Sequence, residues 1–162
     1  MHVITLIYSK RLRGACPLKT RNPGDVDCTC YRLRQAARLV SRTYDSFLAP
    51  CGISIGQFGM LATLAAMNGE SISKLADALQ MERTTLSRNL LPLERLGYVA
   101  SEQGSDRRTR SLILTRSGRE ALATAKPMWQ AAQRSLEKQL GRLEAKMLNQ
   151  TLDDTLKRLP NV

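Results

Sequence analysis

The residues best suited to chemistry form a polar stripe within segment 82–97, ERTTLSRNLLPLERLG. Three leucines in this segment recur at spacings of four and three residues, so they share one side of a helix: Leu86, Leu90 and Leu93. At about 100° per residue, a set of hydroxyl and guanidinium side chains points almost the opposite way, and we expect this outward face to carry no acid. The set comprises Thr84, Arg88 and Arg95, flanked by Thr85 and Ser87.

This outward face has the chemistry that a helix needs in the major groove of DNA. An Arg side chain donates bidentately to O6 and N7 of guanine, and Thr and Ser bond to bases or to phosphates. A polar helix face with two arginines is, however, commonly just a solvated surface. The neighbouring segments therefore have to decide between the two interpretations.

The segment just before the stripe predicts a helix-turn-helix. In the run SISKLADAL, Ser71 is placed to cap a short helix that turns Leu75 and Leu79 inward. Only residues around Gln80 and Met81 separate this helix from the next one. Two short helices joined by a turn of roughly three or four residues form the motif whose second helix enters the major groove.

The segment just after the stripe predicts a β-hairpin. Segments 98–101 and 111–114 are short and β-prone, and they bracket the turn GSDRRTR, which contains Arg107, Arg108 and Arg110. A turn with three arginines between two strands is typical of a wing, which can contact phosphates or the minor groove beside the recognition helix.

Residues 53–118 resemble the winged helix-turn-helix of the MarR family of bacterial transcriptional regulators. The matching motifs are LADAL, RTTLSRNLLPLERLGYV and SDRRTRSLILTRSG, of which the Asp-Arg-Arg wing followed by Leu-Thr-x-x-Gly is the most discriminating. Segments 30–49 and 116–159 resemble the dimerisation helices that flank this domain in the family. The resemblance implies a mainly α fold with a small β-hairpin wing, flanked by N- and C-terminal dimerisation helices.

Two residues depart from the family pattern. The family often has Asp before the Arg that opens the recognition helix, whereas this chain has Glu82, which is a weaker cap. Pro92 lies inside the predicted helix, where it removes one backbone donor and disfavours helical geometry at Leu91. We therefore expect a kink near Pro92.

The bulk composition fits a protein that binds duplex DNA. The chain has 162 residues, enough for one domain with a core, and a net charge of +11, which favours a polyanionic partner. Aromatic residues make up only 4% of the chain, too few to stack on single-stranded bases. No run approaches the roughly 18 apolar residues of a membrane span, so we expect no membrane partner.

The histidine and cysteine content argues against an enzyme and against a zinc site. His2 is the only histidine, and the four cysteines are Cys16, Cys28, Cys30 and Cys51. We find no nucleophile–base constellation, phosphate loop or paired carboxylates, so we expect no enzyme activity, no cofactor and no metal. The apolar run at residues 3–8 is too short for a secretory signal, and we expect a cytoplasmic protein.

The chain divides into four predicted segments. They are a basic N-terminal extension (1–27), an N-terminal dimerisation helix (28–52), a winged helix-turn-helix domain (53–118) and C-terminal dimerisation helices (119–162). The extension has two interpretations, a mobile tail or a basic arm that contacts DNA or the partner subunit.

Apolar spacing predicts the helices on either side of the motif. A helix over 29–49 ends before Pro50, and Ser54 with Gln57 forms a capping box for the next one. That helix carries little charge and is expected to be deeply buried, and Gly69 closes it. Its apolar residues are Phe58, Leu61, Leu64, Ala65 and Met67.

The C-terminal segment predicts two helices with apolar seams. Thr115 caps the first, Pro127 should bend it, and Gly141 separates it from the second. The two seams consist of Leu122, Ala125, Trp129, Ala132 and Leu136, and of Leu148, Leu152, Leu156 and Leu159. Because these seams lie outside the winged domain, pairing with a second chain is their simplest explanation.

We therefore interpret the chain as a dimeric, sequence-specific regulator that binds a pseudo-palindromic site in double-stranded DNA. The resemblance implies that it is a repressor. The alternative is a non-specific or architectural DNA-binding protein, which the high positive charge also suits. The predicted DNA-binding residues are Arg83, Thr84, Thr85, Ser87, Arg88, Asn89, Arg107, Arg108 and Arg110.

Two kinds of signal are candidates for controlling DNA binding by this regulator. Many family members bind small aromatic or anionic compounds between the dimerisation helices and the winged domain, which here implies a crevice near Tyr44, Phe58 and Met67. Other members sense oxidants, and Cys28 and Cys30 lie at a helix start that favours a thiolate. Two further interpretations stay open for the cysteines: Cys30 as a small core residue, and a metal site that also uses Cys51 but lacks a fourth ligand.

Overall fold

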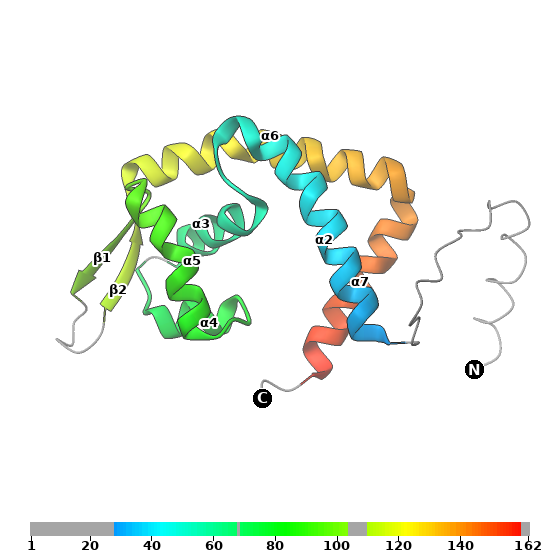
Figure 1. Ribbon diagram of the computed structural model, residues 1–162, viewed down its shortest axis with the longest axis horizontal. Helices are drawn as coiled ribbons and strands as arrows, with labels where there is room; N and C mark the ends of the chain where they lie inside the picture. Colours follow the sequence, from blue (N-terminus) through cyan, green and yellow to red (C-terminus); the bar gives the residue numbers. More distant parts are fainter. Residues whose placement is uncertain (1–27, 68, 104–109, 160–162) are drawn as a thin grey trace, which may run out of the picture. The chain divides into compact units, whose positions relative to one another are not determined.

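The computed structural model describes residues 28–67, 69–103 and 110–159, and at residues 103 and 110 it describes the backbone alone. This part of the chain is mainly helical and contains one antiparallel pair of strands, which confirms the predicted fold class (Figure 1). The elements are α2 (Thr29–Leu48), the 3-10 helix η1 (Ala49–Cys51), α3 (Ile55–Met67), α4 (Ile72–Ala78), α5 (Arg83–Arg95), β1 (Val99–Gln103), β2 (Arg110–Leu114), α6 (Arg116–Leu140) and α7 (Arg142–Arg158).

The chain forms two units, residues 1–35 and 36–162. In the first unit, the described residues form the opening turns of α2. In the second unit, α3 contacts α4, α5, α6 and β2, so it lies at the centre of the core. Six leucines of this unit are almost fully buried, and each contributes about 1.5–3 kcal/mol of hydrophobic stabilisation. They are Leu48, Leu61, Leu75, Leu86, Leu90 and Leu93.

The helix starts follow the capping chemistry that the sequence predicts. Ser54 Oγ accepts from the backbone N–H of Gln57 at 3.3 Å, and Gln57 Oε1 accepts from the backbone N–H of Ser54 at 2.8 Å. Ser71 Oγ accepts from the backbone N–H of Lys74 at 3.3 Å at the start of α4. Both predicted caps are confirmed. The sequence could predict them because each depends only on residues a few positions apart.

Helix α3 is buried along one side only. Phe58, Leu61 and Leu64 are buried as predicted, and Met60 is buried as well. The prediction was wrong for Ala65, which is exposed although it lies seven residues after Phe58, almost in line with it. Met67 is half-buried against the core, and Gly69 has a φ of 85°, which confirms the left-handed glycine after this helix.

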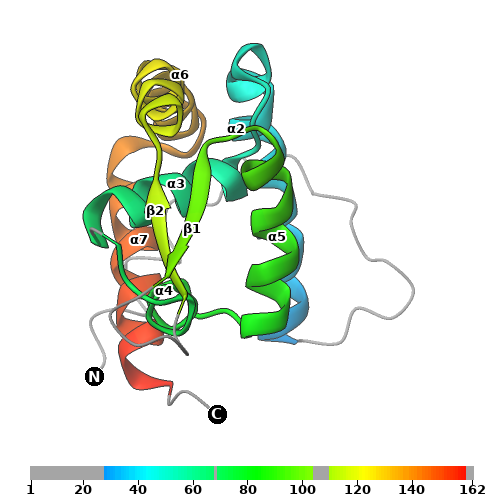
Figure 2. The same ribbon diagram turned by 90° about the vertical axis from the view of Figure 1, so that its left-hand side faces the viewer.

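The two strands form the hairpin that the sequence predicts. Val99 pairs with Leu114, and the register runs to Gln103 opposite Arg110. The sequence did not predict a further contact, in which Ser71 forms an antiparallel bridge with Ser111 and the N–H of Leu112 donates to the carbonyl of Glu70 at 3.1 Å. Figure 2 shows β2 leading into the first turn of α6.

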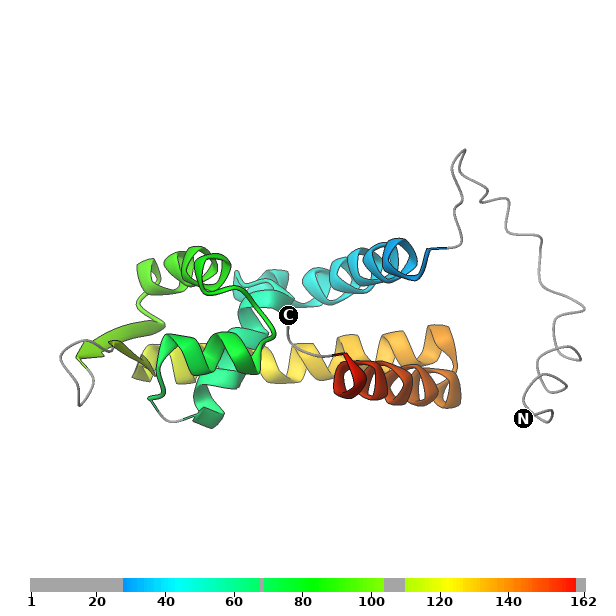
Figure 3. The ribbon, with the colours of Figure 1, turned by 90° about the horizontal axis from the view of Figure 1, so that it is seen from below.

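Helices α6 and α7 contact each other near the turn between them (Figure 3). Gly141 ends α6 with a φ of 95°, as predicted, and Pro127 lies inside α6 without ending it. The α6 seam is buried or half-buried throughout, with Ala125 and Ala132 fully enclosed. Three of the four leucines predicted for the α7 seam are exposed in the single chain: Leu148, Leu156 and Leu159.

Among the described residues, no single helix is long and apolar enough to cross a bilayer. In the same part of the chain, α2 with η1 and α3, taken together as one segment bent by 74°, meets that test by length and composition.

Candidate nucleic-acid interface

Helices α4 and α5 form the predicted helix-turn-helix. Four residues separate them, Leu79 to Glu82, and the turn is held by the N–H of Met81, which donates to the carbonyl of Ala76 at 2.9 Å. Gln80 has a φ of 52°, and its side-chain amide donates to the carbonyl of Asp77 at 2.9 Å. This left-handed residue turns the chain sharply, so α5 can begin close to the end of α4.

The inward side of α5 fixes the orientation of the helix. Leu86, Leu90 and Leu93 are all at most 1% exposed, which confirms the predicted core face. Glu82 is the N-cap residue and makes no side-chain capping bond, as its weaker propensity suggests. The helix continues through Pro92 to Arg95, so this proline does not end it.

The outward side of α5 consists of exposed side chains. They are Arg83, Thr84, Thr85, Ser87, Arg88, Asn89 and Arg95. Ser87 Oγ donates to the carbonyl of Arg83 at 2.8 Å, and its oxygen can still accept a hydrogen bond. Within the described part of the chain, neither the hydroxyls of Thr84 and Thr85 nor the guanidinium of Arg88 has a protein partner.

Two exposed residues on this side of α5 were missed in the sequence. Leu91 is 47% exposed and lies between the polar residues of the face. Glu94 is exposed and lies seven residues after Ser87, almost in line with it. The expectation that the face carries no acid is therefore wrong at its C-terminal end. Both residues could have been placed on this side from the sequence, because the angle of a residue around a helix depends only on its spacing along the chain.

The wing lies next to this helix in the chain. Arg110 is in β2 opposite Gln103, and Arg107 and Arg108 lie outside the described residues. At the other end of the hairpin, the strands lead from α5 and into α6.

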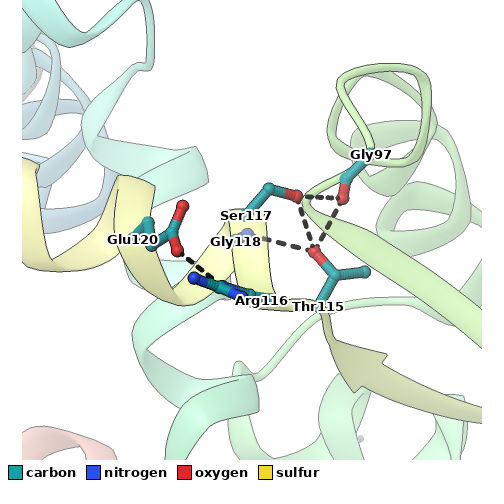
Figure 4. Close-up of polar contacts among 6 residues, drawn as sticks. All are labelled: Gly97, Thr115, Arg116, Ser117, Gly118 and Glu120. Carbon is teal, nitrogen blue, oxygen red and sulfur yellow. Dashed lines mark hydrogen bonds and ion pairs between the residues drawn. The ribbon is translucent and has the colours of Figure 1, made fainter.

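A cluster of hydroxyls joins the end of α5 to the start of α6 (Figure 4). Thr115 Oγ donates to the carbonyl of Gly97 at 2.7 Å and accepts from the N–H of Gly118 at 3.0 Å. Ser117 Oγ donates to the same Gly97 carbonyl at 2.8 Å. Gly118 is buried, and a Cβ at this position would lie 2.1 Å from the Tyr98 carbonyl oxygen. The missing side chain therefore allows α6 to start against the turn that follows α5.

The comparisons with known proteins agree with this geometry. The sequence profile of the MarR family matches residues 53–109. The transcriptional regulator MosR of M. tuberculosis, solved in complex with DNA, is 36% identical, with 82% of this chain and 99% of MosR covered and a TM-score of 0.68. This chain belongs to the MarR family.

Three further matches add detail. The transcriptional repressor CouR, solved with a 23-mer DNA duplex, is 30% identical, with 82% of this chain and 94% of CouR covered and a TM-score of 0.73. A second CouR structure contains p-coumaroyl-CoA and has a TM-score of 0.74 at 25% identity, over the same shares of both chains. An uncharacterized helix-turn-helix regulator of Bacillus subtilis, YwoH, is 28% identical over 86 residues, or 53% of this chain. The match spans 63% of the length of YwoH.

In this MarR-family chain, two of the three predicted crevice residues contact α6. Tyr44 is buried, its hydroxyl donates to Gln133 Oε1, and Gln133 Nε2 donates to Glu137 Oε1 at 2.9 Å. Burial raises the pKa of the Tyr44 hydroxyl, and the negative charge of Glu137 raises it further. Phe58 stacks on Trp129 with ring centroids 5.7 Å apart.

The third crevice residue lies elsewhere on α3. Met67 is nine residues after Phe58, about 13 Å further along the helix axis. Tyr44 and Phe58 therefore contact neighbouring turns of α6, whereas Met67 lies near the other end of α3.

The three described cysteines differ in exposure. Cys28 is half-buried and Cys30 is exposed, so Cys30 is not a core residue within this chain. Cys51 is half-buried, with its Sγ 3.3 Å from Met128 Sδ. Within the described ranges, no three His, Cys, Asp or Glu side chains are placed to hold a metal ion.

Proposed function

We propose that this MarR-family protein is a dimeric transcriptional regulator that binds a specific double-stranded DNA sequence through α5. The outward face of α5 carries the proposal, because its Arg88, Thr84 and Thr85 side chains are exposed and have no partner within the described residues. The buried leucines hold that face in a fixed orientation. MosR and CouR, at 36% and 30% identity, were each solved with DNA, and both support this assignment.

We assign dimerisation to residues 28–52 and 119–162. Leu143, Leu156 and Leu159 of the C-terminal segment are each more than 60% exposed, as is expected of a surface that a second copy covers. A two-fold dimer would place two copies of α5 roughly 34 Å apart, one turn of DNA, which predicts a pseudo-palindromic operator.

A non-specific DNA-binding protein is the alternative that the net charge of +11 favours. Selection of duplexes from a random library by the purified protein, followed by competition at one fixed salt concentration, separates the two functions. A specific regulator recovers one recurring pseudo-palindrome and prefers it to random duplex by about 10³-fold or more. Equal competition by random duplex would leave the architectural function as the better account.

We further propose that the protein represses its target and that a signal releases it from DNA. A small aromatic or anionic effector near Tyr44 and Phe58 is one candidate, without Met67, which lies about 13 Å further along α3. CouR, a repressor by name and also solved with p-coumaroyl-CoA, supports this type of response. Because Tyr44 and Phe58 both contact α6, an effector there would have to displace part of that packing.

Thiol oxidation is the other candidate, supported by the exposure of Cys30 in the single chain and by its nearness in sequence to Cys28. Under this hypothesis peroxide releases the wild-type protein from the selected operator and a thiol reductant restores binding. The Cys28→Ser/Cys30→Ser protein should ignore both treatments, while Cys51→Ser, the matched control, should behave as wild type. A double variant that still responds to peroxide would exclude these two cysteines and favour a small effector.

A further inference from the structure

Leu91 is an exposed apolar side chain in the middle of the face that we assign to DNA. It is 47% exposed, although it belongs to a helix whose three core leucines are at most 1% exposed. At about 100° per residue, Leu91 lies about 20° from Thr84 and about 40° from Arg95. The buried residue Leu93 points about 160° away from it. Leu91 therefore belongs to the outward face and not to its edge.

Packing among the described residues does not explain a leucine at this position. The core face of α5 is complete with Leu86, Leu90 and Leu93, and Leu91 is absent from the hydrophobic core of the described residues. A single exposed leucine is ordinary on a protein surface. This one differs because it is surrounded by Thr84, Ser87, Arg88 and Arg95, side chains of the types that contact bases and phosphates.

The major groove offers a leucine one kind of apolar partner. Base edges there present hydrogen-bond donors and acceptors, and the only apolar group is the C5-methyl of thymine. A leucine pressed against polar base edges would strip water from them without replacing its hydrogen bonds. A leucine against a thymine methyl removes apolar surface of both groups from water.

We infer that Leu91 is a specificity-determining residue that contacts the methyl group of a thymine in each half-site of the operator. Along the helix axis Leu91 lies about 4.5 Å from Arg88. That distance places the thymine roughly one or two base pairs from the base that Arg88 contacts. This inference rests on the proposed function, because it requires α5 to lie in the major groove.

Replacing thymine by deoxyuridine tests the contact, since it deletes the methyl group and leaves the hydrogen-bonding pattern unchanged. In the selected operator, each thymine is replaced in turn in both half-sites, and the affinity of wild type, Leu91→Ala and Leu96→Ala is measured at one salt concentration. Leu96 is the matched control, because it is 50% exposed on the same segment but points about 140° away from Leu91.

At one symmetric thymine position, deleting the methyl group should weaken the binding of the wild-type protein. We expect a loss of about 4-fold in affinity per methyl and about 15-fold when both half-sites lack it. Leu91→Ala should bind the thymine and uracil operators equally, while Leu96→Ala keeps the wild-type difference. Equal melting temperatures of the two variants would show that neither substitution acts through the fold.

Three results would overturn the inference. Wild-type protein that prefers its operator but is indifferent to every methyl deletion has no such contact, and the proposed function stands. A Leu91→Ala protein that keeps the methyl dependence places the contact on another residue. If wild type shows no preference for any operator over random duplex, both this inference and the proposed function fail, and that failure is already visible before any methyl is deleted.

Discussion

Thr115 shows how much of the geometry next to α5 can depend on one hydroxyl. Its oxygen accepts from the N–H of Gly118, which satisfies a free donor of the first turn of α6. Its hydrogen points to the carbonyl of Gly97, in the turn that follows α5. One side chain therefore caps one helix and holds the end of another.

We expect Thr115→Val to destabilise the protein by about 1–2 kcal/mol, because valine keeps the shape but can neither cap α6 nor donate to Gly97. Thr115→Ser, which keeps the hydroxyl, should stay within about 0.5 kcal/mol of wild type. Urea denaturation followed by circular dichroism measures both values. Equal stability of the valine and serine variants would show that the hydroxyl contributes nothing measurable.

At the scale of elements, the contact between α6 and the turn after α5 requires a glycine. The Cβ of an alanine at position 118 would lie 2.1 Å from the Tyr98 carbonyl oxygen, so the backbone would have to move. Gly59, in the middle of α3, is a glycine of the opposite kind, with nothing within 4 Å of the position that a Cβ would occupy.

The two glycines should therefore respond to alanine with opposite signs. Gly118→Ala should lower the free energy of unfolding by about 3 kcal/mol or more through overpacking. Gly59→Ala should raise it by up to about 1 kcal/mol, because alanine has the higher helix propensity and meets no neighbour. Chemical denaturation of the two variants side by side gives the comparison. A tolerated alanine at position 118 would contradict the close approach of α6 to Tyr98.

The elements differ in how far the sequence alone could predict them. The two faces of α5, the Ser71 and Thr115 caps and the glycine at 141 depend on spacings of a few residues, and all were predictable. The bridge from Ser71 to Ser111 joins residues 40 positions apart, and no local pattern indicates it. Leu91 and Glu94 were overlooked for a different reason, since only the hydroxyl and guanidinium side chains of the face had been placed by angle. The wing arginines 107 and 108 lie outside the described residues, so their role stays a prediction.

At the scale of the whole molecule, the proposed dimer makes the α7 seam an interface. Leu156 is 63% exposed in the single chain, so a charge there should leave the fold of that chain intact. The same charge should prevent a second copy from packing on the seam, because it would be buried there without a partner. We expect Leu156→Glu to yield folded monomers that lose specific DNA binding, and Leu152→Glu to do the same. Gln150→Glu adds the same charge at an exposed position of α7 and is the control. Light scattering and operator binding test this, and an intact, DNA-binding dimer in both leucine variants would exclude the seam.

The most direct test of the central claim is the affinity of Arg88→Ala for the selected operator, its single-base variants and random duplex, at several salt concentrations. If α5 lies in the major groove, this change should cost about 1–3 kcal/mol on the best site and relax the preference at one position in each half-site. Arg108→Ala, assigned to the wing, should instead weaken binding to most sequences and flatten the salt dependence. An Arg88→Ala protein that retains wild-type affinity and wild-type base preference would contradict the assignment of α5 as the recognition helix.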